Sequence, residues 1–226
     1  MRKRALLFGD IRFQFKYGFY FIYLIFTLLY IGLLYALPVA WRKTAAILMI
    51  FSDPAAMGLY FMGAIVLFEK SEQVLNSIAI SPVKPFEYVL SKLCSMALIS
   101  TVVAAAIGFS VGIIQNATFL IAVFFCSCLF SAMGLMIAVK TTTLNGFIIA
   151  TILPQLLINI PAFAWLFGYK KTWLLFHPGV SMIELCSNGS YKLISIFVLI
   201  LWTMLFIVFV SFTVQKMFRS VGGAKL

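Results

Sequence analysis

The sequence predicts an all-α integral membrane protein with six transmembrane helices, and three observations support this. Of its 226 residues, 64% are hydrophobic and 10% are charged, whereas a soluble domain carries about 25% charged residues. The apolar residues gather in six runs, each near the ~20 residues that a bilayer core requires. The basic residues lie at the ends of these runs. We therefore expect one transmembrane domain over residues 1–226. Its net charge of +11 should attract the anionic headgroups of membrane lipids, and we expect no nucleic acid as a partner.

Residues 2–17 predict an amphipathic helix that lies along the membrane surface before the first span. Arg12 and Lys16 are four residues apart on one side of this helix, where they would meet lipid phosphates. The apolar side consists of Leu7, Phe8, Ile11 and Phe15. The alternative is a basic tail that only sets the topology.

The six predicted spans cover residues 18–37, 44–68, 93–114, 117–138, 146–167 and 193–214. The second span has an alternative start, because Asp53 and Pro54 suit the N-cap and the first position of a helix. In that case residues 39–51 form a separate interfacial or re-entrant piece, and the span is shorter.

The distribution of Lys and Arg predicts the orientation. With the N-terminus inside, twelve basic residues fall in the inner segments and five in the outer segments. Cytoplasmic segments are enriched in Lys and Arg. We therefore expect both termini in the cytoplasm.

The segment between the second and third spans, FEKSEQVLNSIAISPVKPFEYVLSKL (residues 68–93), holds half of the six acidic residues. Glu69 and Lys70 mark the end of the second span, since a charge at the centre of a membrane helix costs about 2.5–3.5 kcal/mol. A short amphipathic helix should follow, with Val74, Leu75 and Ile78 on one side and Glu72, Gln73 and Asn76 on the other. Ser81-Pro82 should end it, and Lys84-Pro85 should start the next helix.

These residues carry a resemblance to a known family. The cluster Glu69-Lys70-Ser71-Glu72, followed by Val74-Leu75, Ser81-Pro82-Val83, Tyr88 and Lys92, resembles the signature region of ABC-2-type exporter permeases. The run Asp53-Pro54, Gly58, Phe61 and Gly63 is similar to the drug-export branch, the permeases related to fluoroquinolone exporters. One departure is that Gln73 or Val74 stands where the family usually has glycine after the acidic cluster.

The resemblance implies a function that this chain performs with partners. The short helix would insert into a cleft of a separate ATPase subunit, with Glu69, Lys70, Glu72, Leu75 and Ile78 in the docking surface and Ser81 and Pro82 shaping the turn. Two permeases, as a homodimer or with a similar permease, would pair with two ATPases in the bacterial plasma membrane. They would move a drug, peptide or lipid-like substrate out of the cytoplasm.

The chain itself contains no G-x-x-x-x-G-K-[ST] phosphate loop. We therefore expect no cofactor in this chain, with ATP and Mg²⁺ bound by the ATPase. One histidine and six acidic residues provide no paired carboxylates or metal cluster, so an enzyme is not expected. His177, in the outer loop, is interpreted as structural.

Three polar residues are candidates for a translocation path. Asp53 either caps a helix or lies within the membrane as a functional acid. Gln155 and Asn159, between Pro154 and Pro161, either line a path or form hydrogen bonds between helices. Two other hypotheses remain: an ion- or proton-coupled carrier without an ATPase, and a membrane assembly or immunity subunit that transports nothing.

Overall fold

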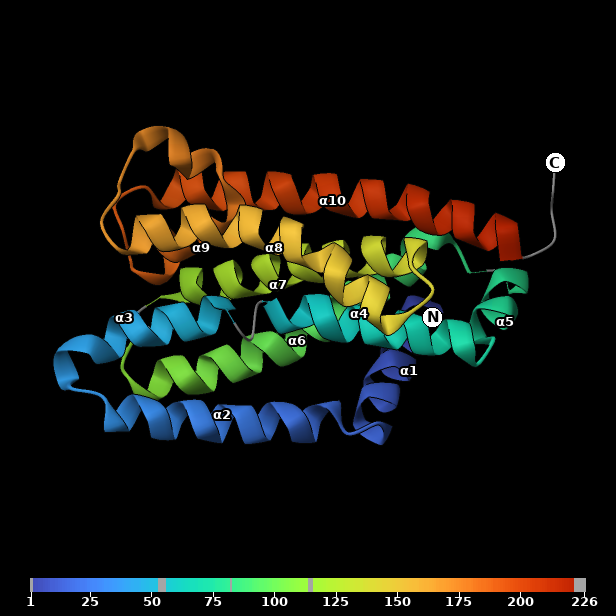
Figure 1. Cartoon of the computed structure of the whole chain (residues 1–226), viewed down its shortest axis with the longest axis horizontal. Coiled ribbons are helices and arrows are strands. Elements are labelled where there is room, and N and C mark those ends of the chain that lie inside the picture. Colours follow the sequence, from blue (N-terminus) through green and yellow to red (C-terminus); the bar gives the residue numbers. More distant parts are fainter. Residues whose placement is uncertain (1, 53–55, 82, 114–115, 222–226) are drawn as a thin grey trace.

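The computed structural model describes residues 2–52, 56–81, 83–113 and 116–221, and this part of the chain contains helices and no strand. Figure 1 shows most helices running along the long axis of the molecule. The elements are α1 (Arg2–Lys16), α2 (Phe19–Ala36), α3 (Val39–Ile50), α4 (Ala56–Ser71), α5 (Val74–Ile80), α6 (Pro85–Ser110), α7 (Ala117–Lys140), α8 (Leu144–Leu166), the 3-10 helix η2 (Thr172–Phe176), α9 (Pro178–Cys186) and α10 (Lys192–Val221).

Five helices in the described part of the chain are long and apolar enough to cross a membrane: α2, α6, α7, α8 and α10. Each corresponds to a predicted span. Helix α6, which corresponds to the predicted span 93–114, begins earlier than that span, because Pro85 takes a first-turn position of the helix. Helix α8 continues through both Pro154 and Pro161. The chain is therefore an all-α protein with the helices of a multi-pass membrane protein.

The predicted second span contains two of the described helices. Residues 44–68 are divided between α3, with 12 residues, and α4, with 16 residues. Each is shorter than the ~20 residues that a bilayer core requires. Figure 1 shows the two helices end to end along the molecule. Asp53 and Pro54, the alternative start of this span in the sequence, lie outside the described residues.

Helix α7 forms the centre of the bundle, where it contacts α4, α6, α9 and α10. Small residues bring α4 and α7 together. A Cβ atom added to Gly134 would overlap the backbone of Leu59 on α4. Such close approach is how helices associate within membranes, where burial of apolar surface gives no advantage over lipid. The packing of α4 on α7 thus fixes the helix that leads into the predicted docking segment.

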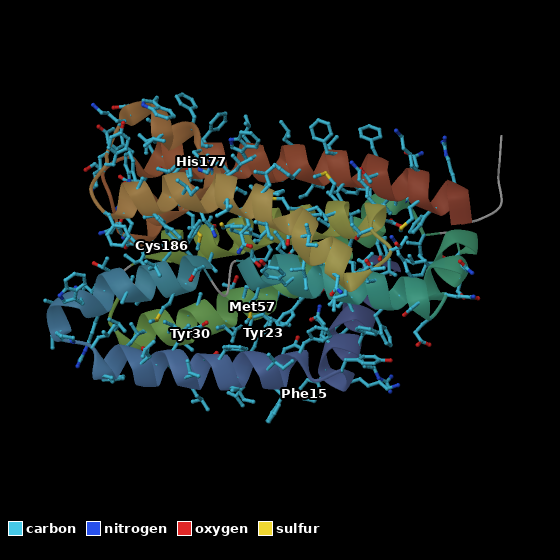
Figure 2. The ribbon with its side chains drawn as sticks, viewed as in Figure 1. Phe15, Tyr23, Tyr30, Met57, His177 and Cys186 are labelled. Atoms are coloured by element: carbon cyan, nitrogen blue, oxygen red, sulfur yellow. The ribbon has the colours of Figure 1, made fainter. Side chains whose placement is uncertain are left out.

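The two ends of the bundle differ. In Figure 1, α1, α5 and the last turns of α10 lie at one end, and the α2–α3 turn and α9 lie at the other. All nine residues of α9 are buried. Its Glu184 accepts hydrogen bonds from Trp165 Nε1 at 3.0 Å and from the backbone N–H of Tyr191 at 3.2 Å. His177 and Cys186 mark this second end in Figure 2.

Candidate functional site

Helices α1, α4 and α6 meet around the buried side chain of Lys92. Lys92 lies on α6 and is 3% exposed. Its Nζ lies 2.5 Å from Oε1 of Glu69 on α4 and 2.7 Å from Oδ1 of Asp10 on α1. One cation therefore joins two acidic side chains from helices that are distant in sequence. We call Asp10, Glu69, Tyr88, Ser91 and Lys92 the Lys92 network.

Each carboxylate of the Lys92 network uses both of its oxygen atoms. Tyr88 donates to Oε2 of Glu69 at 2.6 Å, and Ser91 donates to Oδ2 of Asp10 at 2.5 Å. A buried ion pair offsets the cost of leaving water only when its remaining hydrogen-bonding positions are also satisfied. The hydrogen bonds from Tyr88 and Ser91 meet this condition for both carboxylates. The network can therefore hold the three helices in one arrangement.

Aromatic rings enclose the ammonium group. Lys92 Nζ lies 5.8 Å from the ring centroid of Phe13 and 5.4 Å from that of Tyr88. These distances fit cation–π attraction, which is strongest where water is excluded. The ring of Tyr88 also contacts Phe218 near the end of α10, with centroids 5.5 Å apart. The network thus extends to a fourth helix.

Helix α1 contacts the bundle through the ring of Phe13 and through two polar side chains, Asp10 and Gln14. Gln14 is 1% exposed, and its Nε2 donates to Ser95 Oγ at 2.8 Å and to Met96 Sδ at 3.2 Å. Together with Asp10 it forms the inward side of α1. Arg12 and Lys16 are exposed, as the sequence predicts.

Lys70, the neighbour of Glu69, binds the end of α7. Its Nζ donates to the carbonyl oxygens of Ala138, Val139 and Thr141 at 2.7–2.8 Å. The last carbonyl groups of a helix have no partner within the helix and carry partial negative charge. Lys70 therefore caps α7 and joins it to α4.

A left-handed residue links α4 to α5. Gln73 has φ 54° and ψ 19° and precedes the first residue of α5. Its N–H donates to the carbonyl oxygen of Lys70 at 3.2 Å. This conformation normally favours glycine, because a Cβ atom crowds the backbone. Gln73 is one of the two positions, with Val74, at which the resemblance in the sequence leads us to expect glycine, and its backbone has the left-handed conformation that glycine favours.

The structure divides the predicted docking residues into two groups. Glu69, Lys70 and Leu75 make internal contacts, and Leu75 is 2% exposed. Ile78 is half-buried, and Ser81 donates to the carbonyl oxygen of Ile78 at 2.7 Å. Pro82 lies outside the described residues. The exposed residues of α5 and the turn before it include Glu72, Val74, Asn76 and Ser77.

Two of the predicted path residues, Gln155 and Asn159, lie on α8. Tyr60 on α4 donates to Oε1 of Gln155 at 2.5 Å, so Gln155 makes a hydrogen bond between helices. The Oδ1 atom of Asn159 is buried without a hydrogen-bond partner. Asp53, the third candidate, lies outside the described residues. The two described candidates, Gln155 and Asn159, are four residues apart on the same helix.

Sequence reasoning missed Asp10, Gln14 and the internal role of Glu69. Asp10 and Gln14 are four residues apart, a spacing that places them on one side of a helix. This spacing indicates a polar side of α1, but the aromatic and basic residues of the same helix form a more conspicuous pattern. In the described residues no group of three or more His, Cys, Asp or Glu side chains is arranged to hold a metal.

Comparison with known proteins finds similarity to export permeases. An 80-residue segment is 32% identical to the fluoroquinolones export permease proteins of Mycobacterium tuberculosis strains CDC 1551 / Oshkosh and ATCC 25618 / H37Rv. The chain is similar to export permeases. The match covers 35% of this chain and 34% of each relative, about a third of the relatives' length. No protein-family model matches the chain. The similarity to export permeases is distant, and with the five apolar helices it fits a permease in a transport role.

Proposed function

We propose that this chain is the membrane-spanning subunit of an ATP-driven exporter of the ABC-2 type. It would move an amphipathic or hydrophobic substrate out of the cytoplasm, with energy from a separate ATPase subunit. The observation that carries the proposal is the position of α5, a short helix at one end of the bundle whose two flanking helices, α4 and α6, are joined by Lys92 and Glu69. The similarity to fluoroquinolones export permeases supports it.

The proposed topology has six passes through a bacterial plasma membrane. Helices α3 and α4 together would make the second pass. The end that carries α1 and α5 would face the cytoplasm, in agreement with the twelve basic residues of the inner segments. Both termini would then lie in the cytoplasm.

We place the ATPase contact on the exposed side of α5 and the turn before it. Glu72, Val74, Asn76 and Ser77 are exposed there. Leu75 and the Lys92 network would act behind this surface, by fixing α5 to the membrane helices. The proposed docking surface thus excludes several of the residues that the sequence analysis expects in it.

The internal contacts suggest how a movement of the ATPase would reach the membrane. A push on α5 acts on the rigid link at Gln73. Glu69 would pass the displacement to Lys92 on α6, and Lys70 would pass it to the end of α7. Buried ion pairs resist separation, because an uncompensated buried charge is costly. The helices would therefore move as a unit when ATP binding brings two ATPases together.

A second permease, most simply another copy of this chain, would complete the exporter with two ATPases. Among the five long apolar helices, α2 and α8 are the least buried within the chain, with 17% and 22% of their most apolar stretches buried. They are therefore available to lipid or to the second permease. Within this proposal Gln155 and Asn159 line the path, with the hydrogen bond from Tyr60 holding α8 against α4 in the resting state.

Co-purification tests the proposed function. The full chain is isolated in detergent from its host membrane, and the co-purifying proteins are identified by mass spectrometry. We expect an ABC ATPase with the wild type and its loss with the double variant Asn76→Arg/Ser77→Arg. The matched control is Thr172→Arg/Ser190→Arg, which adds the same charge to exposed residues at the opposite end of the bundle. An ATPase retained equally by all three proteins, or absent from all, would reject docking at α5.

The carrier hypothesis is the second candidate, and one observation favours it. Asp10, Glu69 and Lys92 are charged side chains with little exposure to solvent, and such residues often mark ion pathways in membrane proteins. A carrier would move substrate in vesicles that contain this chain alone and a proton or sodium gradient. Flux without any ATPase would favour the carrier over the exporter.

A further inference from the structure

The outward surface of α1 has no partner within the described residues that would explain its composition. Phe8 is 69% exposed and Phe15 is 72% exposed. Arg12 and Lys16 lie between and beside them, and neither takes part in the two ion pairs found in the described residues. Exposed aromatic and basic residues on one short helix are typical of a binding surface.

A shallow, largely open groove runs along this side of α1. Its volume is about 570 Å³, and it is lined by Phe8, Ile11, Arg12, Phe15 and Lys16. No acidic residue is among them. The one acid of α1, Asp10, is bonded instead to Lys92 and Ser91 on the inward side. The groove therefore combines an apolar floor with two positive charges that no acid lining the groove neutralises.

The groove lies where the first spanning helix begins. The rings of Phe15 and Tyr20 are 5.4 Å apart, which connects the outward side of α1 to the start of α2. Figure 2 shows Phe15 at this junction, on the outside of the bundle. The side of α2 beyond it is apolar and exposed at Phe21 and Leu24. A ligand with a negative head and a long apolar tail fits such a surface.

We propose that this groove binds an anionic phospholipid of the inner leaflet and that the bound lipid orders α5 through the Lys92 network. The phosphate and the acidic headgroup would contact Arg12 and Lys16, and an acyl chain would cover Phe8, Ile11 and Phe15. Asp10 provides the connection, since it lies on α1 and binds Lys92, which in turn binds Glu69 at the base of the α4–α5 link. The proposal rests on the proposed function only in placing α1 at the cytoplasmic surface.

Lipid titration of the full chain in detergent tests the site. The midpoint of the increase in Tm is measured with short-chain phosphatidylglycerol, with phosphatidylcholine of the same chain length, and with inorganic phosphate. We expect a clear midpoint with phosphatidylglycerol and a much weaker response to the other two. Each cation near an anionic lipid contributes about 1 kcal/mol, so Arg12→Gln/Lys16→Gln should shift the midpoint roughly thirty-fold.

The matched control is Lys170→Gln/Lys171→Gln, which removes two exposed cations at the opposite end. It should leave the midpoint unchanged. Equal responses to the two phospholipids, an unchanged midpoint in the Arg12/Lys16 variant, or a shift only in the control would overturn the site. Saturation by inorganic phosphate alone would identify an anion site rather than a lipid site and would also overturn it. None of these experiments contains an ATPase, so their failure leaves the proposed function standing.

Hydrogen exchange tests the connection to α5. We expect phosphatidylglycerol to slow exchange of the amides of Val74–Ile80 several-fold in the wild type. The variant Asp10→Asn keeps Arg12 and Lys16, and it should bind the lipid without slowing α5. Exchange in α5 that ignores the lipid in the wild type, or responds equally in Asp10→Asn, would reject the role of Asp10.

Discussion

Lys92 Nζ lies 2.5 Å from Glu69 Oε1, and both side chains are almost completely buried. This pair joins α4 to α6 on either side of the short helix α5. It also changes the role of Glu69, which the sequence places among docking residues and the structure places inside the bundle. The consequences can be measured, because a buried ion pair and a surface charge respond differently to substitution.

Removal of the cation should destabilise the chain strongly. Lys92→Met leaves Asp10 and Glu69 buried close to each other without a positive charge. Breaking a buried pair in this way costs about 3–5 kcal/mol, which corresponds to a Tm lower by roughly 10 °C. Intrinsic fluorescence during thermal unfolding of the full chain in detergent measures it. The control Lys216→Met, at an exposed lysine, should change Tm by less than about 2 °C, and an equally small change for Lys92→Met would show that the pair contributes nothing.

The cap that Lys70 places on α7 predicts a smaller effect. Lys70→Met removes three bonds to the carbonyl oxygens of Ala138, Val139 and Thr141. We expect a loss of about 1–2 kcal/mol, because partly buried carbonyl groups lose their partner and the helix end loses a favourable charge. Lys140→Met is the matched control, since Lys140 is exposed in the last turn of the same helix. If both variants have the same Tm, the bonds of Lys70 are not stabilising.

The left-handed conformation of Gln73 predicts a stabilising substitution. Gln73→Gly removes the Cβ atom from a residue with φ 54°, where a non-glycine residue costs about 1–2 kcal/mol. Part of this gain is offset by the greater freedom of glycine in the unfolded chain, so we expect Tm to rise by roughly 2 °C. Gln73→Val should lower it. As a control, Asn76→Gly within α5 should also lower Tm, and a decrease in Gln73→Gly would contradict the strain.

Much of the fold could be predicted from the sequence, because hydropathy and length define a membrane helix locally. The starts of α6 at Pro85 and of α7 at Ala117 follow from residues next to them. The division of the second span was present as an alternative, since Asp53-Pro54 is a local feature. Hydropathy alone favours a single 44–68 helix, because the run is apolar on both sides of Asp53-Pro54.

The site was less predictable because its contacts are not local. Asp10 and Lys92 are 82 residues apart, and Gln14 and Ser95 are 81 apart. Glu69 at the end of an apolar run has the same local appearance as an acid that leaves the membrane for water. Only the approach of α1 and α6 shows that it is buried. Glu72 is exposed, in agreement with its expected place on the polar side of the segment.

The single histidine gives a prediction about pH. Burial lowers the pKa of His177, and a backbone hydrogen bond with Leu157 opposes this effect. A group whose pKa is lower in the folded state is protonated more readily in the unfolded state. Stability from His177 is therefore complete above its unfolded pKa of about 6.5, and it decreases as the pH falls below that value toward the folded pKa.

The range between about pH 7 and pH 5.5 contains the usual pKa of a histidine side chain, and the sequence contains one histidine. The ring of His177 is partly exposed, which reduces the effect, so we expect Tm to fall by roughly 2 °C across this range. In His177→Gln the neutral side chain cannot titrate, and the Tm should be constant there. A Tm of the wild type that is constant or rises toward acid pH, or a decrease that persists in His177→Gln, would show that His177 is not the group responsible.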